Sequence, residues 1–140
     1  MTTPEGSNLL KLGDSDLTIS DPAADVRGRA VIDSTGEEIG KVDDLLVDDV
    51  EARVRMLSVE HGGFLGIGAD HFLVPVDAVT AVTDDEVRID RERSRLTDLP
   101  GYDPAVAYEP PYYRDVYGWW DYPSYWAAGY RYPTFPRYPV

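Results

Sequence analysis

Residues whose side chains could do chemistry gather between His61 and His71. This stretch has the sequence HGGFLGIGADH and holds four glycines, two histidines and one aspartate. Backbone N–H groups in glycine-rich loops can bind phosphate, and imidazole together with carboxylate can bind zinc or nickel. The stretch therefore raises two hypotheses: a phosphate loop, and a metal site made by His61, Asp70 and His71.

The surrounding elements argue against the phosphate loop. Such a loop needs the N-terminus of a helix and usually a nearby basic side chain. No Lys or Arg occurs between Arg55 and Arg88, and an apolar strand pattern, HFLVPV, follows the loop. We expect the glycines to serve backbone geometry instead, through positive φ or close approach between two strands. This structural role is assigned to Gly62, Gly63, Gly66 and Gly68.

A metal site is not predicted either. The spacing of His61, Asp70 and His71 matches no known ligand motif, and the position of a third ligand is unknown. The alternative is two half-exposed histidines at strand ends. We therefore predict no metal and no cofactor, and these three residues are the ones to consider if a metal is bound.

Acidic residues cluster between Asp43 and Glu51. Their order lacks the alternating oxygen ligands, central glycine and terminal Glu of an EF-hand, so a solvated hairpin face is the expectation. No G-x-S-x-G signature is present, and paired acids at exposed turns have nothing to shift their pKa. We predict no catalytic residue and no enzyme activity.

The middle of the chain has the pattern of short strands separated by turns. Turn signals occur at 34–36, around 50–52 and at 84–86, and Val87 and Ile89 alternate with charged residues. This spacing predicts a mainly β fold, a small β-barrel of about five to six short, mostly antiparallel strands. Gly36 fits a tight turn, Gly40 a bulge or corner, and Pro75 is also expected to be structural.

Four segments result from this pattern. Residues 1–26 are expected to be a flexible arm, 27–91 the barrel domain, 92–100 a short helix or linker ended by Pro100, and 101–140 a separate tail. The tail holds all ten tyrosines, all three tryptophans and seven of the eleven prolines. We expect this proline density to keep the tail irregular.

Tyrosine and tryptophan dominate binding hot spots, so the tail carries the main functional hypothesis. It could dock on its own barrel, on a second copy or on a partner, or remain a disordered segment that supports assembly. The predicted partner-binding residues are Tyr112, Tyr113, Tyr117, Trp119, Trp120, Tyr125, Trp126, Tyr130 and Tyr132.

Composition excludes several classes of function. The net charge is −13, and residues 1–100 carry 22 acidic side chains against 10 basic ones, which argues against nucleic acid as a partner. There is no cysteine, so disulfides and thiol chemistry are excluded. No run of about 18 apolar residues suggests a membrane span, and no signal peptide is evident, so the expected location is cytoplasmic.

Two blocks in the middle of the chain, GRAVIDSTGEEIGKVDDLLVDD and RVRMLSVEHGGFLGIGADHFLVPVDAV, together with DDEVRID, resemble the PRC-barrel domain. This small β-barrel is shared by the cytoplasmic part of the photosynthetic reaction-centre H subunit and the C-terminal half of a ribosome maturation factor. The tail also resembles those that follow this domain in other small bacterial proteins. The resemblance implies a role in protein–protein contact and no catalytic residue. Residues 1–26 offer no membrane helix like that of the H subunit, and the RNA-binding domain of the ribosome factor is missing.

The sequence therefore predicts a non-enzymatic interaction or assembly module that binds a protein partner or itself, with a homodimer expected. The alternative is a ligand- or cation-responsive sensor that uses the glycine loop and its histidines. A ribosome or RNA-processing accessory factor is the third possibility.

Overall fold

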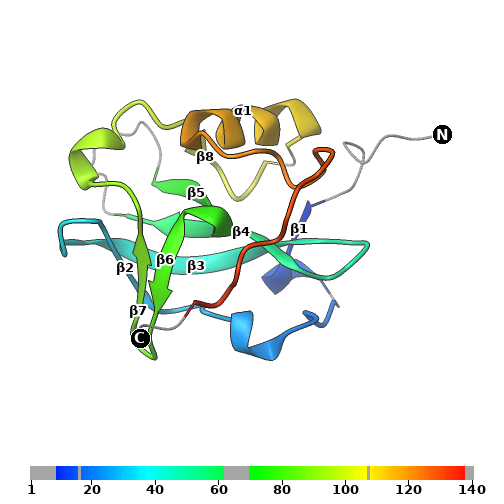
Figure 1. The fold of residues 1–140 in the computed structure, drawn as a ribbon, viewed down its shortest axis with the longest axis horizontal. Helices are drawn as coiled ribbons and strands as arrows, with labels where there is room; N and C mark the ends of the chain where they lie inside the picture. Colours follow the sequence, from blue (N-terminus) through cyan, green and yellow to red (C-terminus); the bar gives the residue numbers. More distant parts are fainter. Residues whose placement is uncertain (1–8, 16, 62–69, 107, 138–140) are drawn as a thin grey trace.

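The computed structural model describes residues 9–15, 17–61, 70–106 and 108–137, which form one sheet, one α-helix and several 3-10 turns (Figure 1). The strands are β1 (Leu9–Lys11), β2 (Ala30–Ile32), β3 (Glu38–Asp48), β4 (Val54–Glu60), β5 (His71–Pro75), β6 (Val79–Val82), β7 (Glu86–Ile89) and β8 (Gly101–Tyr102). The helix is α1 (Pro110–Trp120).

The sheet has the order β6-β7-β2-β3-β4-β5-β8, and β1 pairs with β3 off this path. β2 and β7 are parallel, and the other pairs are antiparallel. β7 alternates between buried and more exposed residues, as a strand with one solvated face does. In β4, by contrast, six consecutive residues from Val54 to Val59 are buried. Both faces of β4 are therefore covered.

Two glycines have clear geometric roles in this sheet. Gly36 has a φ of +97° in the turn after β2, a conformation that L side chains rarely adopt. At Gly40 a Cβ would lie 2.3 Å from the carbonyl oxygen of Glu60. The register between β2 and β3 also shifts here, because Val31 pairs with Gly40 while Ile32 pairs with Glu38. β3 thus bulges where another backbone approaches closely.

The sheet differs from the predicted barrel in strand number and closure. It has eight strands instead of five to six, and in the described part of the chain no ladder joins β6 to β5 or β8. β1 and β8 come from segments predicted to lie outside the barrel. In the structure they are part of the sheet, because β1 pairs with β3 and β8 pairs with β5. Strands of two or three residues are too short to show a period-2 pattern, which is why the sequence did not indicate them.

The prediction of an irregular tail is wrong for α1. Pro110 and Pro111 occupy the first helical turn, where the missing N–H groups would have no intrahelical acceptor. The helix buries one face, and it ends at Asp121 in the left-handed conformation with a φ of 66°. The buried residues are Tyr113, Val116, Tyr117 and Trp120.

The short helix predicted over residues 92–100 is a 3-10 turn of three residues, Arg93–Arg95. The Asp33 carboxylate accepts the Arg93 N–H at 2.9 Å and fixes the start of this turn. A second turn follows, in which the Leu99 N–H donates to the Leu96 carbonyl. Leu96 and Leu99 are both buried, so two turns are sufficient to bring them into the core.

Candidate protein-interaction interface

The aromatic tail, residues 101–137 as far as they are described, is bonded to the sheet at both of its ends, at β5 and at β6. At one side β8 pairs with His71 and Phe72 of β5. At the other side the Val82 N–H of β6 donates to the Arg137 carbonyl at 2.6 Å. Figure 1 shows the orange-to-red chain running from α1 across the sheet toward β6. Because edge strands present unpaired backbone groups to other chains, the tail shields part of both edges.

Trp120 fixes the end of α1 to the sheet. Its side chain is fully buried, and its indole Nε1–H donates to the Leu73 carbonyl at 2.9 Å. This carbonyl belongs to the residue of β5 that follows the two paired with β8. On the other side Arg91 donates to the Trp120 carbonyl at 2.6 Å, with its guanidinium carbon 5.2 Å from the Trp120 ring centroid. A buried tryptophan thus has its polar atom satisfied by the main chain of the sheet.

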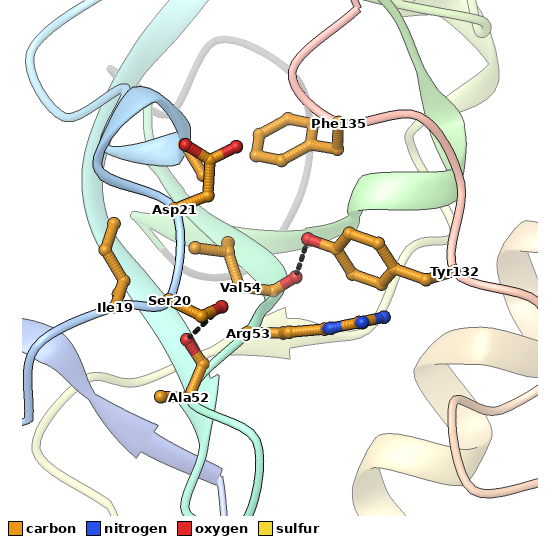
Figure 2. A pocket seen from close by; sticks show the side chains of 9 residues that line it. Ile19, Ser20, Asp21, Ala52, Arg53, Val54, Tyr132 and Phe135 are labelled. Atoms are coloured by element: carbon orange, nitrogen blue, oxygen red, sulfur yellow. Dashed lines mark hydrogen bonds between the residues drawn. The ribbon is translucent and has the colours of Figure 1, made fainter.

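Tyr132 fixes the end of the tail in the same way. Its hydroxyl donates to the Val54 carbonyl at 2.9 Å, and its ring faces the side chain of Arg53 (Figure 2). Tyr130 uses its hydroxyl differently, donating to the Asp77 carboxylate at 3.1 Å. Burial raises the pKa of Asp77 and also that of Tyr130. Burial raises the pKa of Tyr132 to about 12.

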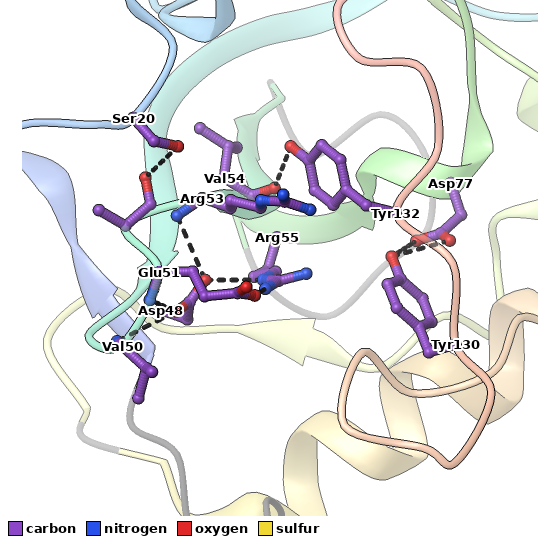
Figure 3. A network of polar contacts seen from close by, with 11 residues as sticks. Ser20, Asp48, Val50, Glu51, Arg53, Val54, Arg55, Asp77, Tyr130 and Tyr132 are labelled. Carbon is purple, nitrogen blue, oxygen red and sulfur yellow. Dashed lines mark hydrogen bonds and ion pairs between the residues drawn. The ribbon is translucent and has the colours of Figure 1, made fainter.

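A buried ion pair lies beneath these rings (Figure 3). Arg55 is 4% exposed, and its Nε donates to Asp48 at 2.8 Å while its Nη2 donates to Glu51 at 2.6 Å. The guanidinium carbon lies 4.6 Å from the ring centroid of Tyr125 and 5.3 Å from that of Tyr132. Burial disfavours the Asp48 carboxylate, but the Glu51 N–H and the Arg55 guanidinium outweigh it and lower the Asp48 pKa. A desolvated cation under two tyrosine rings is the setting in which cation–π attraction is strongest.

Comparison with models of known protein families gives a match. A family model described as PRC-barrel domain matches residues 20–96, more than half of the chain. The chain belongs to the PRC-barrel domain family. This match includes β2 to β7, and β8 and α1 follow it. PRC-barrel domains serve in protein interaction and assembly.

Two further findings concern curated relatives and membrane-spanning helices. A comparison with curated proteins gave no match. Within the described residues, no helix combines the length and apolar character that crossing a bilayer requires.

All nine predicted partner-binding residues are buried or half-buried within their own chain. Tyr113, Tyr117 and Trp120 are buried in the shared core. The others are half-buried, so part of each residue is accessible to solvent. These are Tyr112, Trp119, Tyr125, Trp126, Tyr130 and Tyr132.

The described part of the stretch from His61 to His71 gives no support for a metal site. His61 is buried with its ring 5.5 Å from that of Phe72, and the Nε2 of His71 lies 3.3 Å from an Asp43 carboxylate oxygen. The His61 N–H donates to the Asp70 carbonyl, so these two residues meet through the backbone. Among the described residues no group of three or more His, Cys, Asp or Glu side chains could hold a metal ion. The glycines of this stretch, Gly62, Gly63, Gly66 and Gly68, lie outside the described residues.

The sequence did not predict the residues of the PRC-barrel domain that the tail contacts. Arg55 carried a usable signal, because it is a lone charge within the apolar run VRMLSV. Such a charge must be paired if the strand is buried on both faces. Asp48 was assigned to a solvated acidic hairpin, but it is 1% exposed and accepts three backbone N–H groups. Leu73 and Val54 contribute main-chain carbonyls, which no side-chain pattern can indicate.

Proposed function

We propose that this chain is a non-enzymatic PRC-barrel interaction module that binds a second copy of itself through its docked aromatic tail. The observation that carries the proposal is the way the tail presents its rings. Six of the predicted partner-binding residues are only half-buried, so each keeps part of its surface accessible to solvent. The docked tail is then part of the folded domain and also forms the surface that contacts the second copy.

Ring-to-ring contacts hold the outer rings in place before any partner arrives. The rings of Trp119 and Trp120 meet edge-on with centroids 5.1 Å apart, and so do those of Tyr125 and Trp126. Association loses free energy when mobile side chains must be ordered, and rings that are already ordered avoid much of that loss. Exposed tryptophan and tyrosine are also the side chains most enriched at binding hot spots.

Charge supports a protein partner over nucleic acid. The net charge of −13 opposes binding to a phosphate backbone, and the buried Arg55 is already paired with Asp48 and Glu51. The proposal assigns no catalytic role. The sensor and the ribosome accessory factor remain the alternatives, and calorimetry with zinc and calcium tests the sensor.

Sedimentation of the full chain over a range of concentrations tests the proposal. We expect a dimer that Trp126→Ala and Trp119→Ala weaken by at least about tenfold in Kd, the equivalent of about 1.4 kcal/mol. The matched control is Val50→Ala, because Val50 is 78% exposed and outside the tail. A monomer at every concentration, or a dimer equally stable in all three variants, contradicts self-association through the tail.

A further inference from the structure

A cleft of about 330 Å³ lies where three segments distant in sequence meet (Figure 2). The segment before β2 contributes residues 19–21 and Ala24, and the tail contributes Tyr132 and Phe135. The third segment is 52–54, the loop that leads into β4 and the first residue of that strand. Ile19, Val54 and Phe135 are nearly completely buried and give the cleft an apolar wall. The volume is at the lower end of the range for small-molecule sites, about 300 to 1,000 Å³.

Arg53 supplies an available cation at this cleft. Its guanidinium carbon lies 4.8 Å from the Tyr132 ring centroid, which fixes the orientation of the side chain. Among the described residues this guanidinium has neither a hydrogen-bond acceptor nor an ion-pair partner, whereas Arg55 is neutralised by two carboxylates. A planar guanidinium with free N–H groups matches the geometry of a carboxylate.

Asp21 supplies the opposite charge. One carboxylate oxygen accepts the Ala23 N–H at 3.0 Å, and no ion pair with a described residue engages the group. Figure 2 shows its carboxylate beside the ring of Phe135, on the other side of the cleft from the Arg53 side chain. The cleft thus presents one anion and one cation, unpaired with each other, around an apolar wall.

We propose that this cleft binds a small zwitterion, a free α-amino acid with an apolar side chain. The ligand carboxylate bonds to Arg53, its ammonium group bonds to Asp21, and its side chain contacts Phe135 and Ile19. Asp21 and the net charge of −13 disfavour a simple anion, and Arg53 disfavours a simple cation. Because Tyr132 and Phe135 belong to the tail, the bound ligand also stabilises the docked tail.

The test is calorimetry on the full chain with three probes: L-leucine, N-acetyl-L-leucine, which lacks the ammonium group, and L-leucinamide, which lacks the carboxylate. We expect L-leucine to bind, to raise the Tm, and to bind at least about tenfold more tightly than either blocked probe. Arg53→Gln should abolish the preference for leucine over leucinamide. Asp21→Asn, which retains the cap on the Ala23 N–H, should abolish the preference for leucine over N-acetyl-leucine.

Matched controls are Arg131→Gln and Asp84→Asn, which change exposed residues outside the cleft. Thermal melting shows that each variant is folded. The proposal is overturned if L-leucine does not bind at about 10 mM, if N-acetyl-leucine binds as tightly as leucine, or if Arg53→Gln binds leucine unchanged. None of these outcomes depends on the tail's role in self-association, which sedimentation measures separately.

Discussion

At the scale of single residues, the ion pair between Arg55 and Asp48 lies under two rings of the tail, those of Tyr125 and Tyr132. Both side chains are almost completely buried, and Asp48 also receives the N–H groups of Val50, Glu51 and Arg53. A buried pair adds little net stability over an apolar replacement, but removing one partner leaves the other charge desolvated. The main effect of the pair is therefore to determine how the rings of Tyr125 and Tyr132 pack over Arg55.

Asp48→Asn should destabilise the protein by about 3 kcal/mol at pH 7, because Arg55 then lies buried without its main counter-charge. The effect should depend on pH. The pKa of Asp48 is lowered in the folded state, so its contribution is present above the unfolded pKa of about 3.9 and is lost as pH falls through the folded value. Urea unfolding of both proteins at several pH values should show the difference shrink in acid.

The control for this prediction is Asp84→Asn, which changes an exposed carboxylate at a turn. It should shift the urea midpoint little at any pH. Equal effects of the two substitutions at pH 7 would contradict a buried Asp48–Arg55 pair.

At the scale of elements, α1 shows where the sequence was sufficient and where it was not. The aromatic residues of 113–120 recur at helical spacing, with Tyr113, Tyr117 and Trp120 on the buried face. The high proline content led to the prediction of an irregular tail, because a count takes no account of where each proline lies. Prolines in the first turn do not break a helix. The strands of the middle segment were predictable, since the turn signals between them are local and β7 also alternates. β1 and β8 were not, because they are stabilised by neighbours distant in sequence.

Two glycines of the tail give a matched pair of substitutions that tests this element. A Cβ at Gly118 meets nothing within 4 Å, so Gly118→Ala should stabilise the protein by about 0.5–1 kcal/mol through helix propensity. Gly129 has a φ of +79°, so Gly129→Ala should destabilise it by about 1 kcal/mol. Chemical denaturation measures both. Two neutral substitutions would indicate that the tail is not folded as described.

At the scale of the whole molecule, the tail lies along the line where the sheet fails to close. β5 and β6 follow each other in the chain but do not pair, and the tail bonds to β5, to Asp77 between them and to β6. The sequence indicated a docked tail as one of several outcomes, because a domain of about 65 residues buries only about 60% of its unfolded surface and is marginally stable alone. It could not indicate this path, which depends on main-chain carbonyls and on the open seam.

All ten tyrosines lie in the tail, so alkaline titration reports on its docking. Burial is the first cause in every case and raises the pKa of seven of them. The pKa rises to about 12 for Tyr113, Tyr122 and Tyr132. It is also raised for Tyr102, Tyr112, Tyr117 and Tyr130. Raised folded pKa values mean that this stabilisation is complete below the unfolded value of about 10 and is lost as pH rises through the folded values.

We therefore expect phenolate absorbance to rise together with the tryptophan fluorescence change, and mostly above pH 10. The same titration in denaturant is the control and should follow a pKa of about 10. If the native chain also ionises all its tyrosines near pH 10, without a fluorescence change, the rings are not buried.

Hydrogen exchange of the Trp120 indole N–H tests the docked tail most directly, because that group donates to the Leu73 carbonyl and its side chain is fully buried. The three indole signals can be assigned by substituting each tryptophan with phenylalanine. We predict that the Trp120 N–H exchanges only on global unfolding, at the rate of the slowest core amides, while those of Trp119 and Trp126 exchange faster. Exchange of Trp120 as fast as that of the other two indoles would contradict the account.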